Sequence, residues 1–306
     1  MEFLETPQER FDGLQGYAFQ PHYREVDAIG LRMHFVDEGP AEAAPILMLH
    51  GEPSWSYLYR RMIPIAASAG HRVVAPDLIG FGKSSKPTRV SDYTYQRHCD
   101  WVAALIEGLD LREITLICQD WGSLIGLRLA AELESRFARI VLANGGLPAG
   151  DGASGLGLRQ IPNVVAFLAW HAFARFVPRL PVARILQVGT QRRLDPEELR
   201  AYEAPFPDER YMAGARAFPS LVPISASDPA IPRNRKAWEV LERWEKPFLT
   251  AFSDGDPITR GIQSQFQKRV PGAKGIEHPT LRGGHFLQED SGPELVRLAI
   301  DLIEAG

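Results

Sequence analysis

Short apolar runs alternate with longer helical stretches from Pro45 to Ala143, and this order restricts the fold more than any other feature of the chain. The runs are apolar on both faces, as in strands buried within a parallel sheet. They cover residues 46–49, 73–75, 114–118 and 140–143. Helices are expected between them, over about 56–68, 93–108 and 121–134. Alternating strands and helices predict an α/β protein with a mostly parallel, doubly wound sheet.

The pattern of apolar residues differs on both sides of this region. Residues 24–37 alternate as an antiparallel hairpin does, with Gly30 near the turn. From residue 148 to 226 the chain is Gly- and Pro-rich and helical, without a buried strand run. Strand patterns resume at 248–252 and weakly at 275–281, and an amphipathic helix is expected over 291–304. We therefore predict a core of residues 1–147 and 227–306, with residues 148–226 inserted as a helical cap.

Composition excludes several classes of function. The net charge of −4 provides no basic surface for nucleic acid, and no apolar run reaches the ~18 residues of a membrane span. The acidic amino terminus does not resemble a signal peptide, and two cysteines do not make a disulfide framework, so a cytoplasmic protein is expected. The histidines are scattered, which argues against a metal site.

The segment ITLICQDWGSLIG, residues 114–126, joins a predicted strand to a predicted helix through a turn at Asp120. Nucleophilic serines occupy such turns in the pattern G-x-S-x-G. Here Asp120 replaces the serine, Cys118 replaces the first glycine and Gly122 keeps the second. A carboxylate can displace a leaving group from an sp³ carbon and form an ester, which water must then hydrolyse. Asp120 is therefore predicted to be a nucleophile; the alternative is that it only caps the next helix.

A histidine and two acidic residues near the end of the chain complete a possible catalytic set. His285 lies in RGGHFLQED before the final helix, where the order nucleophile, acid, histidine requires a base, although a surface histidine without a role is the alternative. Asp254 and Asp256 lie upstream in FSDGDP, and one of them would orient His285. We favour Asp256 because it lies beyond the Gly255 turn and precedes Pro257; Asp254 remains open as a second candidate.

The loop after the first buried strand reads HGEP and is expected to supply part of an oxyanion hole. In this arrangement one backbone N–H comes from that loop and the other from the residue after the nucleophile. These amides belong to Glu52 and Trp121. His50 is expected to be structural, linking the loops beneath the site by hydrogen bonds.

Taken together, these residues resemble the haloalkane dehalogenases of the α/β-hydrolase fold, and in particular the subfamily whose second halide-binding tryptophan lies in the cap. The resemblance extends over most of the chain. HGxP and DWG also occur in epoxide hydrolases, whereas the cap segments are more specific. The segments are HGEPSWSYLYR (50–60), DLIGFGKSSKP (77–87), QDWG (119–122), FLAWHAF (167–173), APFPDERYMAGARAFP (204–219) and GGHFLQED (283–290).

The resemblance implies hydrolysis of haloalkanes to alcohol, halide and a proton, with no cofactor. Trp121 and Trp170 would hold the departing halide through their indole N–H groups. Other dehalogenase subfamilies have an asparagine donor in place of Glu52, and an ionised glutamate could not donate, which favours Trp170. The alternative for Trp170 is packing within the cap. The expected pocket walls are Phe167, Leu124, Phe218, Pro219, Val222 and Ile258.

Two other functions are considered beside this one. An epoxide hydrolase would use the same triad with a cap tyrosine as acid, and Tyr202 and Tyr211 are available. A non-catalytic binding protein of this fold would have a broken triad or oxyanion loop, and neither is seen. We expect the substrate and halide to be the only partners of a monomer.

Overall fold

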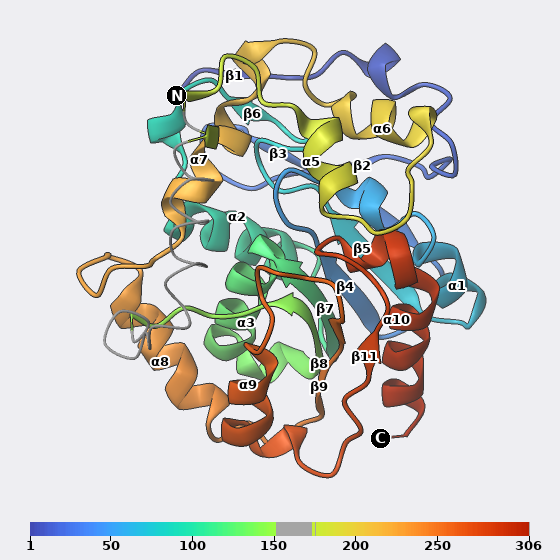
Figure 1. Ribbon diagram of the computed structural model, residues 1–306, viewed down its shortest axis with the longest axis vertical. Helices are drawn as coiled ribbons and strands as arrows, with labels where there is room; N and C mark the ends of the chain where they lie inside the picture. The colour runs from blue at the N-terminus through green and yellow to red at the C-terminus, as the bar shows by residue number, and fades with distance from the viewer. Residues whose placement is uncertain (151–172, 175, 306) are drawn as a thin grey trace.

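The computed structural model describes residues 1–150, 173–174 and 176–305. Its centre is a seven-stranded sheet in the order β2-β3-β5-β4-β7-β8-β9 (Figure 1). β4, β5, β7, β8 and β9 are parallel neighbours, whereas β2 and β3 are antiparallel. The strands are β2 (His22–Glu25), β3 (Arg32–Glu38), β4 (Pro45–Leu49), β5 (Arg72–Pro76), β7 (Ile114–Asp120), β8 (Phe137–Gly145) and β9 (Phe248–Thr250). The four predicted buried strands, the hairpin and the α/β-hydrolase fold class are therefore confirmed.

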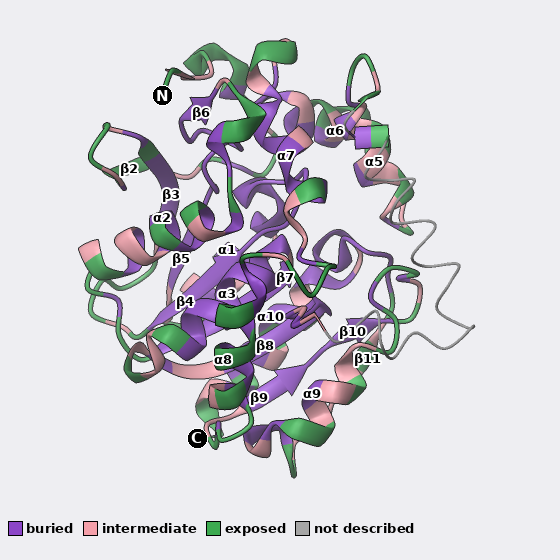
Figure 2. Cartoon of the chain, turned by 90° about the vertical axis from the view of Figure 1, so that its left-hand side faces the viewer, coloured by how far each residue is buried: buried purple, intermediate pink, exposed green. Residues whose placement is uncertain are grey.

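Helices lie against both faces of the sheet, and short strand pairs flank it. The outward sides of the helices are exposed, whereas the central strands of the sheet, such as β4, β5, β7 and β8, are largely buried (Figure 2). The pairs are β1 (Phe3–Leu4) with β6 (Lys86–Pro87), and β10 (Phe252–Ser253) with β11 (Thr280–Leu281). The sheet-covering helices are α1 (Ile63–Ser68), α2 (Tyr95–Gly108), α3 (Trp121–Glu132), α8 (Ile231–Leu241), α9 (Gln263–Arg269) and α10 (Leu287–Glu304).

Two predicted helices have different bounds from those expected, and proline explains both. The helix expected over 56–68 is instead a 3-10 turn, Ser56–Tyr59, followed by α1. A continuous helix is prevented because Pro64 has no N–H to donate and its ring would clash with the carbonyl group four residues earlier. The final helix begins at Leu287 instead of 291 and is interrupted at Ser291, where φ is −131° and ψ is 31°. Pro293 causes this interruption in the same way.

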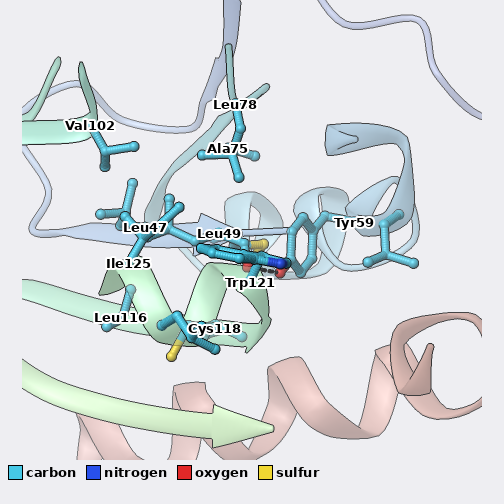
Figure 3. Packing of buried hydrophobic residues seen from close by; sticks show 14 of the residues in the cluster. Leu47, Leu49, Tyr59, Ala75, Leu78, Val102, Leu116, Cys118, Trp121 and Ile125 are labelled. Atoms are coloured by element: carbon cyan, nitrogen blue, oxygen red, sulfur yellow. Dashed lines mark hydrogen bonds between the residues drawn. The ribbon is translucent and has the colours of Figure 1, made fainter. Parts of the chain in front are cut away.

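The buried side chains of β4, β7 and α3 interlock directly below the end of the sheet that carries the site. Leu47, Leu49, Leu116 and Ile125 are fully buried and lie together, with the ring of Trp121 beside them (Figure 3). Burial of this kind contributes about 25 cal/mol per Å² of apolar surface. The strand ends that carry the functional residues are therefore held on a rigid base.

Between β8 and β9 the described residues form α5 (Val182–Val188), α6 (Pro196–Glu203), α7 (Ala213–Leu221) and α8. α5, α6 and α7 lie beyond one end of the sheet (Figure 1), whereas α8 packs on α3. The division of the chain at 147/148 and 226/227 stays a prediction. No helix in the described ranges is long and apolar enough to span a membrane.

A buried ion network connects α6 and its preceding loop to the core. Glu289 in α10 accepts hydrogen bonds from Arg60 at 2.6 and 3.0 Å and from Arg192 and Tyr202. Glu198 in α6 accepts from Arg60 at 2.5 Å. Removal of one partner from such a network leaves an uncompensated buried charge. The network therefore holds the α5–α6 region in a defined position over the segment that contains His285.

Candidate active site

Asp120 ends β7 in a conformation that few residues other than glycine adopt, with φ 50° and ψ −126°. This turn directs its side chain above the sheet at the start of α3. Asp120 occupies the N-cap position, but its side chain makes no capping hydrogen bond. Gly122 allows α3 to pass close to β4, since a Cβ there would lie 1.9 Å from the carbonyl oxygen of Leu49. The alternative that Asp120 is simply a helix cap is therefore wrong.

The fold brings His285 between two carboxylates. Its Nε2 lies 3.4 Å from Asp120 Oδ2, and its Nδ1 lies 3.1 Å from Asp256 Oδ2. His285 and Asp256 are buried, with 5% and 1% of their surface exposed. Asp254 is exposed and accepts instead from the backbone N–H of Gly283 at 3.0 Å. The structure thus brings Asp120, His285 and Asp256 together, and Asp254 does not contact the histidine.

The two carboxylates control the charge of His285. Burial alone lowers the pKa of the imidazole, but hydrogen bonds to Asp120 and Asp256 raise it to about 10. For Asp256, burial raises the pKa, but the hydrogen bond and charge of His285 hold it below its ordinary value. The two neighbouring carboxylates therefore favour the imidazolium form of His285 at neutral pH.

Asp256 is fixed by the turn that follows it. Its Oδ1 accepts from the Ile258 N–H at 2.8 Å, and its Oδ2 accepts from the Thr259 N–H at 3.2 Å and from the Thr259 hydroxyl. These donors orient the carboxylate toward Nδ1 of His285. Thr259 was not predicted from the sequence, although its position three residues after an Asp is typical of such turns.

Two further residues around His285 were also missed. The Gln119 side-chain nitrogen donates to the His285 carbonyl at 3.1 Å and lies 3.2 Å from Nε2. Asn144, at the end of β8 with φ 32°, donates to the carbonyls of Gly284 and His285 at 2.9 and 3.1 Å. Both residues lie at carboxyl ends of parallel strands, which is where side chains of such sheets converge. That location is the only signal the sequence offered.

The HGEP loop reaches the nucleophile as expected. The Glu52 N–H donates to Asp120 Oδ1 at 2.8 Å, and the Glu52–Pro53 peptide bond is cis. Gly51 is required here because a Cβ would lie 2.3 Å from Asp120 Oδ1. The Trp121 amide, the second expected donor, directly follows Asp120 at the start of α3.

His50 joins the loops beneath the site. Its Nδ1 hydrogen-bonds the Gly51 carbonyl at 2.9 Å, and its Nε2 accepts from the Leu78 N–H at 2.9 Å. Burial lowers the pKa of His50. An uncharged imidazole that holds two loops is a structural element, in agreement with the expectation.

The side chain of Glu52 differs from what the sequence suggested. It is 7% exposed, and its Oε1 has no hydrogen-bond partner in the described part of the chain. Burial, together with the charge of Asp120, raises the pKa of Glu52 well above its ordinary value. A protonated carboxyl can donate a hydrogen bond. Burial of Glu52 therefore favours the uncharged carboxyl and weakens the argument for Trp170 that assumed an ionised Glu52.

Trp121 forms part of an aromatic group beside Asp120. Its ring stacks on Phe218 at 4.5 Å with an interplanar angle of 24°, and the ring of Tyr95 meets it edge-on at 5.5 Å. Four expected wall residues differ in burial: Leu124, Phe218 and Pro219 are buried, and Val222 is half-buried. Ile258 is 59% exposed, in contrast with the expected wall position. Trp170 and Phe167 lie outside the described residues.

The two tyrosines of the alternative epoxide reaction lie in different environments. The Tyr202 hydroxyl is buried and donates to Glu289 in the ion network. It is therefore not available to protonate a substrate at Asp120. Tyr211 is half-buried in a turn ahead of α7, below the guanidinium of Arg210. Among the described residues, no group of three His, Cys, Asp or Glu side chains could hold a metal ion.

Known proteins of similar sequence and structure agree with the fold described above. The α/β-hydrolase fold family matches residues 44–291. Haloalkane dehalogenases of Mycolicibacterium paratuberculosis and Mycobacterium marinum are 55% and 53% identical, covering 96% and 98% of this chain and 96% and 99% of theirs. Among solved structures, haloalkane dehalogenase DpaA from Paraglaciecola agarilytica, described as tetrameric, has a TM-score of 0.89 and 35% identity, with 98% of both chains covered.

Proposed function

The chain belongs to the haloalkane dehalogenases of the α/β-hydrolase fold, and we propose that it cleaves the carbon–halogen bond through an ester on Asp120. The observation that carries this proposal is the placement of one carboxylate between the Glu52 N–H and the His285 ring. The N–H fixes Oδ1, so that Oδ2 is the oxygen that attacks. In the first step Oδ2 bonds to the substrate carbon, and the halide leaves with the electrons of the broken bond.

The ester changes the charge of the site. Asp120 becomes neutral on alkylation, so that it no longer holds the proton on His285. The pKa of the imidazole then falls, and His285 can act as a base. Water adds to the ester carbon, its proton passes to Nε2, and the charge that develops on Oδ1 is held by the amides of Glu52 and Trp121. Collapse of this intermediate releases the alcohol and restores Asp120.

Halide departure requires donors on the opposite side of the substrate carbon. We assign this role to the indole N–H groups of Trp121 and Trp170, which stabilise an anion without competing as nucleophiles. Buried Leu124, Phe218 and Pro219 supply apolar surface for a haloalkane, which offers few hydrogen-bonding groups. Phe167 and Val222 belong to the same proposal for the pocket wall, whereas the exposed Ile258 does not.

Trp170→Phe is expected to lower the rate of dehalogenation by on the order of a hundredfold, because it removes one donor to the departing anion and keeps the aromatic ring. Quenching of tryptophan fluorescence by bromide should weaken in parallel, and the melting temperature should change little. Stopped-flow fluorescence and halide release measure both effects.

Trp244→Phe is the matched control, because Trp244 is buried and its indole nitrogen has no hydrogen-bond partner in the described structure. This variant should retain full bromide binding. Should Trp170→Phe also retain both its rate and its bromide affinity, Trp170 would be a packing residue of the cap.

The reaction itself is tested by comparing two substrates. Purified protein should release bromide from 1-bromobutane or 1,2-dibromoethane and should form no diol from styrene oxide. Diol formation without bromide release would overturn the proposal and point to Tyr211 as the acid of an epoxide hydrolase.

The remaining expectations complete the proposal. The ligands are a small haloalkane and its halide, with no cofactor, in a cytoplasmic protein whose residues 148–226 form the cap. A monomer stays a prediction, and DpaA, which is described as tetrameric, gives no support to it.

A further inference from the structure

A turn between α5 and α6, residues 189–192, packs against the loop that carries His285. The N–H of Phe286, directly after the histidine, donates to the Gly189 carbonyl at 2.9 Å. On the other side of the histidine, a Cβ at Gly284 would lie 2.4 Å from the same carbonyl oxygen. The backbone on both sides of His285 therefore lies against this turn.

Asp290, near the start of α10, binds the same two segments. Its Oδ2 accepts from the Gly284 N–H at 2.8 Å and from the Gln191 N–H at 3.0 Å, and its Oδ1 accepts from the Arg192 N–H at 2.8 Å. Hydrogen bonds to a charged acceptor are stronger than those between neutral groups. One carboxylate thus joins the residue before His285 to the turn.

The side chain of Gln191 connects this loop to the loop that carries Asp256. Its nitrogen donates to the Gly283 carbonyl at 2.9 Å and to Asp254 Oδ1 at 3.3 Å. Asp254 Oδ1 also accepts from the Gly283 N–H at 3.0 Å. Gln191 therefore bridges two loops at points two residues before His285 and two residues before Asp256.

From this arrangement we propose that Gln191 is a positioning residue for the pair Asp256 and His285, and that Asp254 is an acceptor through which it acts. The proposal rests on the ester mechanism proposed above. The 3.1 Å separation of His285 Nδ1 from Asp256 Oδ2 depends on how the two loops lie relative to each other. Gln191 and Asp254 fix that relative position and act through the loops, not on the substrate.

This role for Asp254 differs from that of an acid in the triad. A positioning Asp254 needs only an oxygen that accepts from Gln191 and Gly283, and an amide oxygen does this as well as a carboxylate oxygen. An acid partner of His285 must carry a negative charge that stabilises the imidazolium. The two roles therefore predict opposite results for Asp254→Asn.

Loss of the Gln191 bridge should affect the second half of the reaction only. Alkylation uses the carboxylate of Asp120, which the N–H of Glu52 holds from a different loop. Hydrolysis uses His285 as the base, and its ring must be aligned with the water that it activates. Misplacement of a catalytic group by about 1 Å can cost on the order of a hundredfold in rate.

The test measures the halide burst and the decay of the ester separately in single-turnover experiments. Gln191→Leu removes the donor and should leave the burst unchanged, while ester hydrolysis should slow by on the order of tenfold. Asp254→Ala should also slow hydrolysis, whereas Asp254→Asn should hydrolyse the ester at the wild-type rate. The double variant with Gln191→Leu and Asp254→Ala should be no slower than the slower single variant, because both changes break one contact. Gln191 and Asp254 are exposed, so these variants should fold.

The pH profile of hydrolysis separates positioning from a general loss of stability. The ionisable groups that face His285 are Asp120, Asp256 and Glu52. Asp120 is neutral in the ester, so Asp256 is the partner that keeps the proton on the ring. A weaker contact with Asp256 lowers the pKa of His285, and the acid limb of the profile should move to lower pH in Gln191→Leu.

Arg193→Leu, an exposed change directly after the turn, is the control and should keep the wild-type rates and profile. The proposal is overturned if Gln191→Leu hydrolyses the ester at the wild-type rate, if it slows the burst as much as hydrolysis, or if its effect adds to that of Asp254→Ala. Loss of hydrolysis in Asp254→Asn would overturn it as well and would make Asp254 an acid partner. Absence of any burst or ester in the wild-type protein would instead overturn the proposed function.

Discussion

Asp120→Ala is expected to abolish dehalogenation, with a loss on the order of a millionfold, the scale seen when a hydrolase loses its nucleophile. Water cannot replace the carboxylate, because the attacking oxygen must be held in line with the carbon–halogen bond. The change removes the side chain above the sheet and leaves the core below it unaltered. Bromide release and a thermal unfolding curve measure the two consequences.

Isotope labelling gives a second measurement of the same claim. After one turnover in H₂¹⁸O, the label should appear in the carboxylate of Asp120, and the first alcohol released should contain none. Asp100→Ala is a suitable control, since Asp100 is exposed on α2 and bonds only to Gln96 among the described residues. Substantial activity in Asp120→Ala, or ¹⁸O in the first alcohol, would contradict the nucleophile assignment.

His285→Gln is expected to stop the reaction after its first half. Alkylation needs only the carboxylate and the halide donors, so a burst of halide should still appear. Hydrolysis needs a base, and its loss is expected to slow this step by 10²–10⁴-fold on the order-of-magnitude scale of general base catalysis. Intact-protein mass spectrometry should therefore show a stable alkyl adduct, and peptide mapping should place it on Asp120.

The stability of the free protein should also depend on pH in a defined direction. The pKa of His285 is raised to about 10, so the proton is bound more tightly in the folded state than in the unfolded state. This contribution to stability is fully present below the ordinary histidine pKa and is lost as the pH rises toward 10. His285→Gln should lack that loss of stability, whereas His22→Gln, an exposed change on β2, should keep it.

Failure of His285→Gln in both half-reactions, alkylation and hydrolysis, would contradict the division between nucleophile and base.

The sequence by itself determined the sheet and the order of the candidate catalytic groups. Strands and helices of this fold differ in the spacing of apolar residues, and that spacing is local, so the four buried strands could be identified without the structure. The turn at Asp120 and the loop at His285 were identified for the same reason, since each directly follows a strand pattern. Helix starts were less accurate where Pro64 and Pro293 interrupt the backbone.

Only the tertiary structure decided which of several equivalent residues meet. Asp254 and Asp256 are two residues apart, and the path of the Gly255 turn alone brings Asp256 to His285. Tyr202 was a possible acid until the fold placed its hydroxyl on Glu289. That the side-chain oxygens of Gln119 and Glu52 are buried without a hydrogen-bond partner among the described residues is likewise visible only in the fold. The protonation of Glu52 could not be predicted from the sequence either. It depends on burial and on nearby charges, which are properties of the folded chain and not of residue order.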